Sequence, residues 1–152
     1  MKKGYMLIEV VLAFGIACII VTSEVVILSK YLHNYKNTIE TNRSMFYSKE
    51  ALSFIEEQLK FAKDVEVHDD GIYFTQVSYN YYNSTGNFNY FKKTLGGSLI
   101  IHYFNSSTGK YGENNVLTNI KDFKAQLNDK ILNIKIVTKN GESYEKCITI
   151  KK

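Results

Sequence analysis

The sequence predicts an α+β fold in which a long N-terminal helix packs on an antiparallel β-sheet. Two observations lead to this class. The stretch from Met6 to Leu28 is almost entirely apolar and long enough for a helix, whereas from Asp64 onward short aromatic and β-branched runs alternate with turn residues. The chain has 152 residues, which leaves room for one domain with a modest core and one element outside it. With 45% hydrophobic and 22% charged residues, the composition is that of a folded protein.

The apolar stretch is long enough to cross a membrane. As a helix, residues 5–28 would extend roughly 36 Å, and the hydrocarbon core of a bilayer is about 30 Å thick. Lys2 and Lys3 precede the stretch, and no lysine or arginine lies within it. The positive-inside rule therefore places the N-terminus in the cytoplasm. We expect a single-pass protein of the cell membrane whose C-terminal domain, after Leu28, is extracellular.

Three ordinary membrane segments compete for this stretch. A secretory signal peptide would end at small residues after a short apolar run, but here the run continues through Val21 to Leu28. A lipoprotein signal would place its cysteine after the run, whereas Cys18 lies in the middle of it. A plain signal anchor fits the length, but it gives no reason for Glu9.

Glu9 is the residue that distinguishes this segment. A carboxylate at such a depth costs on the order of 3 kcal/mol, so an intramembrane acid is a candidate functional residue. If the chain were cut after Gly4, the new α-amino group of Tyr5 would lie one helical turn from Glu9, on the same helix or on a neighbour. Glycine suits such a cut because it lets the backbone enter a protease groove closely. The alternative is a glutamate near the interface whose side chain reaches water.

The run Lys2-Lys3-Gly4-Tyr5-Met6-Leu7-Ile8-Glu9, followed by an apolar helix, resembles the N-terminal cleavage and methylation motif of type IV pilins and type II secretion pseudopilins. The resemblance implies that Gly4 ends a leader removed by a prepilin peptidase and that Tyr5 becomes an N-methylated N-terminus. It implies that Glu9 pairs with the N-terminal amine of a neighbouring subunit during assembly. The implied partners are other pilins or pseudopilins and an assembly-platform membrane protein, and the implied location after assembly is a cell-surface filament.

The resemblance also implies a pilin-like lollipop fold with four parts. They are a leader (1–4), a transmembrane and assembly helix (5–29), a soluble half of that helix (30–63) and an antiparallel β domain (64–152). Some features depart from major pilins: Met6 stands where Thr or Ser is common, Glu24 lies near the end of the apolar run, and the chain has no proline to kink the helix. They favour a minor pilin or pseudopilin, and the stretch from Ala51 to Val65 followed by late strands looks like the J-type pseudopilins and W-type minor pilins.

The helical pattern continues beyond the membrane segment. Apolar residues recur at three- and four-residue spacing and predict a buried helix face that reaches about Lys63: Tyr31, Tyr35, Ile39, Met45, Leu52, Ile55, Leu59 and Ala62. Residues 34–42 include weaker helix formers, where a bend could occur. We expect one long helix or two nearly continuous ones.

From Asp64 the hydrophobic period changes to two. The expected strands are Val65 to Val67, Ile72 to Tyr82, Ser98 to Phe104, Phe123 to Leu127, Ile131 to Thr138 and Ser143 to Ile150. Asn140-Gly141 between the last two predicts a hairpin with a type I′ turn, and hence an antiparallel sheet. The stretches Asn83 to Asn89 and Asn105 to Asn115 are rich in Asn, Gly and Ser and are expected to be exposed loops.

The sequence contains no recognisable catalytic or cofactor motif, so we expect no enzyme activity, no cofactor and no metal. His68-Asp69-Asp70 is typical of a turn rather than a metal site. Cys18 and Cys147 fall in different parts of the chain, so no intramolecular disulfide is expected. The net charge of +4 is scattered, and aromatic residues, 14% of the chain, fit core and subunit contacts better than stacking on nucleic acid. DNA would be a partner only if the filament served competence.

A second hypothesis of a different class stays open from these residues. In it the chain is an uncleaved, single-pass membrane-anchored extracellular binding module. Detection of an N-methylated Tyr5 would distinguish the filament subunit from this module. The residues do not indicate whether a filament would belong to a pilus, a secretion system or a competence system.

Overall fold

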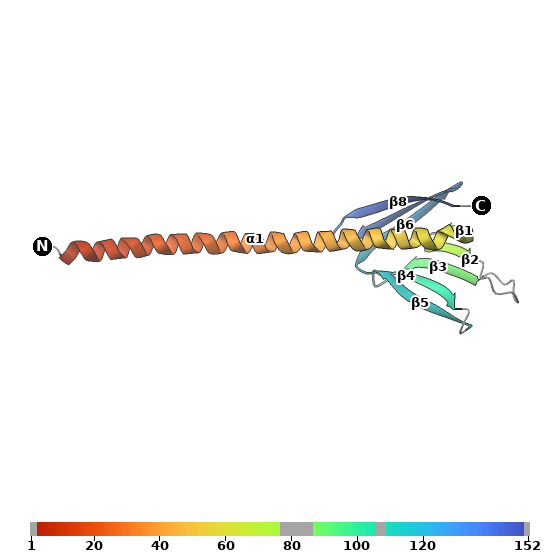
Figure 1. Ribbon diagram of the computed structural model, residues 1–152, viewed down its shortest axis with the longest axis horizontal. Coiled ribbons are helices and arrows are strands. Elements are labelled where there is room, and N and C mark those ends of the chain that lie inside the picture. Colours follow the sequence, from red (N-terminus) through yellow and green to blue (C-terminus); the bar gives the residue numbers. More distant parts are fainter. Residues whose placement is uncertain (1–2, 77–86, 106–108, 151–152) are drawn as a thin grey trace. The chain divides into compact units, whose positions relative to one another are not determined.

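The computed structural model describes residues 3–76, 87–105 and 109–150 of the chain. Among these residues it has one helix, α1, followed by eight strands, β1 to β8 (Figure 1). The chain divides into two compact units, Met1–Asn42 and Arg43–Lys152. The described residues of the first unit are all helical, and the second unit combines the last turns of α1 with the eight strands.

Helix α1 extends over Lys3–Lys60. The weaker helix formers in residues 34–42 do not interrupt its hydrogen bonding, and the Thr38 hydroxyl donates to the carbonyl oxygen of Asn34 at 2.9 Å. Of the two expected arrangements, one long helix is the observed one. It ends at Lys60 rather than at the expected Lys63, because the chain enters the first strand at residue 62.

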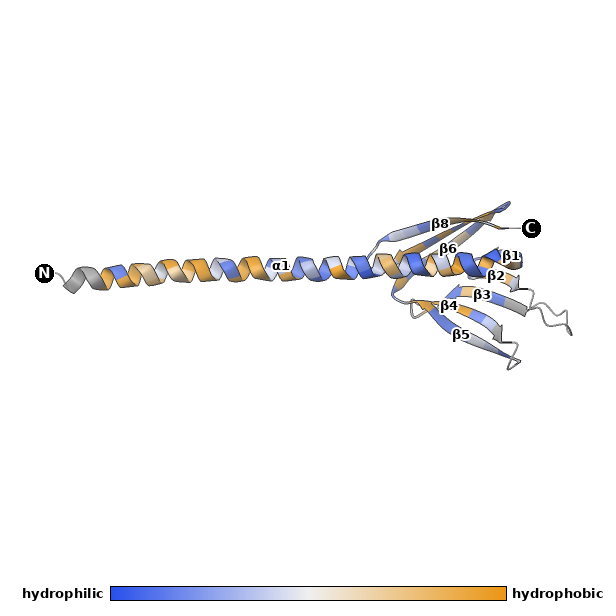
Figure 2. Ribbon diagram, in the orientation of Figure 1, coloured by the Kyte–Doolittle hydropathy of each residue, from blue (hydrophilic) through white to orange (hydrophobic). Residues whose placement is uncertain are grey.

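The first unit presents an apolar helix surface. Every side chain described from Leu7 to Asn42 is exposed, and Figure 2 shows the hydrophobic colour concentrated in the N-terminal half of α1. The hydroxyls of Thr22 and Ser23 donate to helix carbonyls three or four residues earlier, at 2.7 to 2.9 Å. Their hydrogen bonds are therefore made inside the helix, an arrangement that would also suit lipid surroundings. By length and composition α1 is able to cross a membrane.

The second unit contains two antiparallel sheets rather than the single sheet that the sequence predicts. The first has the order β1-β2-β3-β4-β5 and the second the order β6-β7-β8. The strands are β1 (Ala62–His68), β2 (Gly71–Gln76), β3 (Asn87–Lys93), β4 (Leu99–Asn105), β5 (Lys110–Leu117), β6 (Ile120–Asn128), β7 (Ile131–Thr138) and β8 (Ser143–Thr149). All neighbouring strands pair in antiparallel fashion, which confirms the predicted direction of pairing.

Most of the predicted strands are present. β7 has the expected bounds, and β8 ends one residue before the expected Ile150. The runs expected at 65–67 and 123–127 fall in β1 and β6, and the run expected at 98–104 falls in β4 except for Ser98, which precedes that strand. The strand expected at 72–82 is β2 as far as Gln76, and residues 77–82 lie outside the described part of the chain.

Two predicted loops are wrong where the structure describes them. Residues 87–89 belong to β3, and Asn89 is only 5% exposed. Residues 110–115 belong to β5, which pairs with β4 and lies at the edge of its sheet. An edge strand exposes most of its side chains to water, so its amino-acid composition resembles that of a loop. Its backbone nevertheless forms hydrogen bonds with the neighbouring strand. Residues 83–86 and 106–108 lie outside the described part.

The turn between β7 and β8 differs from the expected type I′ turn. Gly141 has a φ of 86°, but Asn140 does not have a positive φ. The amide of Gly141 donates to the carbonyl of Thr138 at 3.0 Å, and the amide of Thr138 donates to the carbonyl of Glu142 at 2.9 Å. These bonds define a type I turn followed by a glycine bulge. The loop therefore spans residues 139–141, and only the glycine needs the left-handed conformation.

The core of the second unit is built on the C-terminal turns of α1. Leu52, Ile55 and Leu59 are at most 3% exposed, which confirms this part of the predicted buried face. The prediction is wrong for Tyr31, Tyr35, Ile39 and Met45, which are 37 to 64% exposed, and Ala62 is buried in β1 rather than in the helix. The sheets contribute the following buried residues: Ile72, Phe74, Phe91, Leu99, Ile101, Leu117, Ile120, Phe123, Leu132, Ile134, Ile136 and Ile148. Since both sheets share one cluster with the helix, the second unit has a single hydrophobic core.

Candidate functional site

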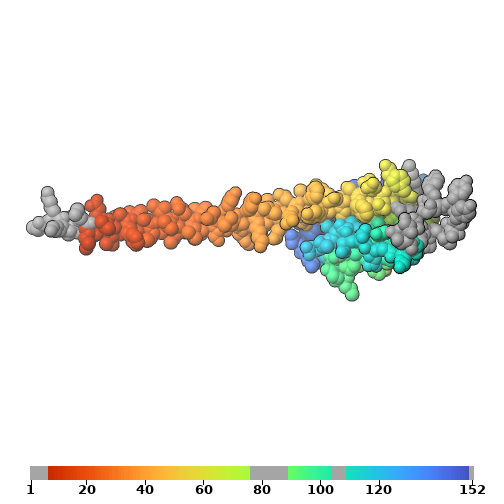
Figure 3. All heavy atoms as spheres, turned by 60° about the horizontal axis from the view of Figure 1, so that its bottom comes forward, coloured from red at the N-terminus to blue at the C-terminus, as the bar shows by residue number. Residues whose placement is uncertain are grey.

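The predicted site residues lie in the first turns of α1. Gly4 and Tyr5 are helical, and their side chains lie outside the described part of the structure. Glu9 follows in the same helix, between Ile8 and Val10, which are 66% and 68% exposed. It is the one charged residue between Leu7 and Ser23. Figure 3 shows the N-terminal part of the chain as an extended rod of exposed atoms. In its first turns Glu9 is the one carboxylate among exposed apolar side chains.

The helical spacing relates Glu9 to the proposed cleavage point. Tyr5 and Glu9 are four residues apart, which is one turn and about 6 Å along the axis. Glu9 makes no ion pair with any described residue, and the nearest cations in sequence, Lys2 and Lys3, precede the proposed cut. An amine at Tyr5, on this helix or on a parallel neighbour, would be the counter-charge that the surrounding apolar surface lacks.

The triplet His68-Asp69-Asp70 forms the end of β1 and the turn to β2, as the sequence predicts. The Asp70 carboxylate accepts hydrogen bonds from Lys92 Nζ at 2.8 Å and from the Tyr73 hydroxyl at 2.9 Å. The lysine first and the tyrosine second hold the pKa of Asp70 below its ordinary value. Asp70 thus acts as a link between the turn and β3. Among the residues that the structure describes, no group of three or more His, Cys, Asp or Glu side chains could hold a metal ion.

A ladder of aromatic rings crosses the outer face of the five-stranded sheet, and the sequence analysis did not anticipate it. Neighbouring rings on successive strands lie 4.6 to 5.2 Å apart between centroids: His68 on β1, Tyr73 on β2, Tyr90 on β3, His102 on β4 and Tyr111 on β5. The ring of His102 is stacked with the ring of Tyr90 at an interplanar angle of 11° and with the ring of Tyr111 at 20°.

This ladder is a poor platform for stacked bases. A nucleobase stacks on a free ring face, but the faces of His102 are covered by the rings of Tyr90 and Tyr111. The Nδ1 atom of His102 is buried and has no hydrogen-bond partner in the described part of the chain, which is consistent with an enclosed ring. The ladder therefore stabilises cross-strand pairing, the ordinary role of aromatic pairs on a sheet. The sequence analysis missed the ladder because its rings become neighbours only through the register of strand pairing, which the sequence alone does not give.

An open groove lies between β1 and β6. It has a volume of about 610 Å³ and is lined by Val65, Glu66, Val67, His68, Gln126, Leu127 and Asn128. The titratable side chains in its lining are Glu66 and His68, which approach to 3.4 Å and are 75% and 56% exposed. Two solvated groups on a surface do not form the enclosed, polarising environment that acid–base catalysis requires.

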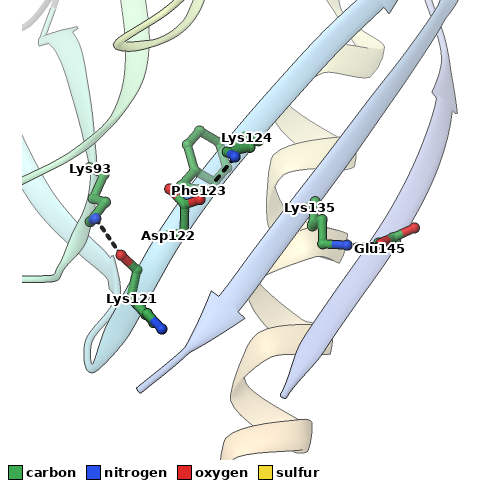
Figure 4. A network of polar contacts seen from close by, with 7 residues as sticks. All are labelled: Lys93, Lys121, Asp122, Phe123, Lys124, Lys135 and Glu145. Carbon is green, nitrogen blue, oxygen red and sulfur yellow. Dashed lines mark hydrogen bonds and ion pairs between the residues drawn. The ribbon is translucent and has the colours of Figure 1, made fainter. Parts of the chain in front are cut away.

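Polar contacts elsewhere on the second unit connect strands rather than form a pocket. Figure 4 shows Lys93 of β3 directed at the carbonyl oxygen of Lys121 in β6, a hydrogen bond between the two sheets. It also shows Lys135 and Glu145 facing each other on the paired strands β7 and β8. Their Nζ and Oε1 atoms form an ion pair at 2.6 Å. On the helix, Glu56 pairs with Lys146 of β8 at 2.5 Å. These contacts fix strand and helix positions. Cys18 and Cys147 are free thiols.

No protein-family model, curated protein or solved structure matches this chain. The function must therefore be inferred from the residues of this chain and their structure. The part of α1 before Arg43 is not accounted for by folding, because its apolar surface is exposed and Glu9 and Glu24 form no ion pair with any described residue.

Proposed function

We propose that this chain is a pilin-like subunit, a minor pilin or pseudopilin, of a helical filament of a type IV pilus, type II secretion or competence system. The observation that carries the proposal is Glu9, the one charged residue between Leu7 and Ser23 of an exposed apolar helix, one turn after Tyr5. A helix that only anchors a domain has no use for such a charge, which costs on the order of 3 kcal/mol to insert.

Assembly would follow from the placement of this charge. A prepilin peptidase would remove residues 1–4 and free the α-amino group of Tyr5. The subunit would wait in the membrane with Glu9 in lipid, and the amine of a neighbouring subunit would attract it at short range in a low-dielectric medium. The exposed apolar side chains of α1 would then pack against those of neighbouring helices, and the filament would grow by stacking of N-terminal helices.

The core of the second unit leaves the N-terminal part of the helix surface free for contacts between subunits, which supports this function. Its core is complete with the helix from Ala51 to Leu59 and the two sheets, so it does not use the surface of Leu7 to Asn42. That helix surface is therefore available for contacts between subunits. The outer faces and edges of the sheets would be carried to the outside of the filament, where partners of the assembled fibre would meet them.

The test is the substitution Glu9→Gln, which keeps the shape of the side chain and removes its charge. Insertion and cleavage should be unchanged, whereas the amount of subunit in sheared filaments should fall at least about ten-fold, because the amine of the neighbour loses its counter-charge. Glu40→Gln is the matched control, since Glu40 lies on the same helix beyond the apolar stretch. Equal amounts of Glu9→Gln and parent protein in filaments would refute the pairing mechanism.

Mass spectrometry of the N-terminus separates this function from that of an uncleaved membrane-anchored binding module. The pilin-like subunit should begin at Tyr5 and carry a methyl group on its α-amine. A chain purified from membranes that still begins at Met1, in cells whose other prepilins are cleaved, would overturn the proposal and favour the binding module.

A further inference from the structure

Glu24 is a second carboxylate on the apolar helix, and neither the fold nor the cleavage motif accounts for it. It lies in α1 between two apolar runs, Val10–Val21 and Val25–Leu28. In a helix that enters the membrane near Tyr5, it would be about 28 Å further along the axis, near the far edge of a hydrocarbon core of about 30 Å. A carboxylate at that depth is only partly hydrated, so a nearby cation would lower its energy.

The chain offers Glu24 no such cation of its own. Glu24 forms no ion pair with any described residue. The nearest lysine in sequence is Lys30, and the helix positions next to Glu24, three and four residues away on either side, are all apolar: Ile20, Val21, Ile27 and Leu28. Lys30 lies six residues ahead, about 9 Å along the axis and a third of a turn around it, which is not a neighbouring position on the helix surface.

A second copy displaced along the helix supplies the missing cation. This step rests on the proposed function, in which the amine at Tyr5 of one copy meets Glu9 of another. That contact sets a displacement of four residues, about 6 Å, between parallel helices. The same displacement brings Glu24 of the displaced copy to the level of residue 28 of the first. It is then two residues, about 3 Å, below Lys30 of that first copy, a difference that the long lysine side chain can span.

The rotation about the helix axis also permits both contacts. At about 100° per residue, Glu9 and Lys30 lie about 60° apart around one helix, and Tyr5 and Glu24 lie about 100° apart around the other. Each helix therefore presents both of its charges to the same side. Side chains within such an arc can meet those of a parallel neighbour, because glutamate and lysine both reach several ångströms from the axis.

We propose that Glu24 of one copy pairs with Lys30 of the neighbouring copy, so that two charge pairs at opposite ends of the membrane-spanning helix fix the stagger between subunits. A single pair at Glu9 leaves the far ends of two helices free to separate or slide. A second pair with the same displacement selects one stagger, and a neighbour without a cation at this level would lack it.

Charge exchange in the full-length chain tests this pairing. Two copies with different affinity tags are expressed together, and the amount of one recovered with the other from detergent-solubilised membranes is measured. Glu24→Lys in both copies, or Lys30→Glu in both, should reduce recovery by about five-fold, because each places like charges together. The double variant with both changes in both copies should recover to within about two-fold of the parent.

A mixed experiment shows that the pair joins different copies. When one tagged copy carries Glu24→Lys and the other carries Lys30→Glu, opposite charges meet whichever copy is the displaced one, and recovery should rise above that of either single variant alone. Lys36→Glu is the control, because Lys36 lies about 180° around the helix from Glu9 and about 120° from Lys30, on the side away from the proposed contact. Its recovery should equal that of the parent. Mass spectrometry of the N-terminus in the same samples tests the proposed cleavage separately.

Two results would overturn the inference. The first is a double variant whose recovery stays as low as that of the single variants, which would mean that each residue contacts something other than its counterpart in a second copy, such as a different subunit. The second is single variants whose recovery equals that of the parent. Failure of the proposed function has a different signature, namely a chain that is not cleaved after Gly4 whatever residues stand at 24 and 30.

Discussion

Truncation of Ile55 tests whether the last turns of α1 belong to the core of the second unit. Ile55 is 0% exposed and belongs to the cluster that joins the helix to both sheets. Ile55→Ala removes three buried carbon atoms, each worth about 0.8 kcal/mol in transfer free energy. The cavity left behind adds to this loss, so we expect the free energy of unfolding to fall by about 3 kcal/mol.

The assay is urea and thermal unfolding of a fragment that begins at Lys30, followed by circular dichroism. The fragment should fold without oxidation, because Cys147 is a free thiol. At about 4 °C per kcal/mol, Ile55→Ala should lower its melting temperature by roughly 12 °C. Glu57→Ala is the matched control, since Glu57 is exposed two residues away and its loss should stay within about 0.5 kcal/mol. A loss below about 1 kcal/mol for Ile55→Ala would show that the helix does not contribute to this core.

Three further changes address the sheet, the turn and the leader. Gly71→Ala would place a Cβ 2.1 Å from the carbonyl oxygen of Phe91, so unfolding in urea should show a loss of about 3 kcal/mol or more, and an unchanged midpoint would contradict the β2–β3 register. The hydrogen bond from Lys92 lowers the pKa of Asp70, so its contribution to stability is complete above the ordinary value of 3.8 and disappears as the pH falls through the lower folded-state value. Parent and Asp70→Asn should therefore differ in melting temperature at neutral pH and converge in acid; a constant difference would exclude this ion pair as its source. Gly4→Val should leave the chain at its precursor mass on an immunoblot, because the larger side chain would clash in the peptidase groove, and a normally processed band would refute the assigned cut.

Local patterns were sufficient where one face of an element is buried and the other is not. Ile134 and Ile136 are buried and alternate with the exposed Lys135, so periodicity located β7 correctly. The helix face at Leu52, Ile55 and Leu59 was located for the same reason. β5 was missed because most of its side chains are exposed, so its strand conformation comes from backbone pairing with β4, a partner that no local window contains.

Glu9 could be identified from the sequence alone, whereas the arrangement of the strands in two sheets could not. Glu9 is conspicuous in the sequence because a charge in an apolar helix is costly whatever the tertiary structure. The division into two sheets was not predictable from the alternating pattern, because that pattern is the same for one sheet and for two. The ring ladder through Tyr73, Tyr90 and His102 was hidden for a related reason, since these residues become neighbours only through the pairing of β2, β3 and β4.

The separation of the two sheets has a consequence for how the second unit opens. No strand of one sheet is paired with a strand of the other among the residues described. The contacts between them include one backbone hydrogen bond, which the Ile120 amide donates to the Gly97 carbonyl, and the hydrogen bond from the Lys93 side chain to a β6 carbonyl. Each sheet can therefore lose its ladder while the other keeps its own, as two cooperative units of local unfolding. Amide hydrogen exchange should resolve two protection classes, one for β1–β5 and one for β6–β8. The helix from Ala51 to Leu59 should exchange with the more stable of them, because it remains packed as long as either sheet is intact.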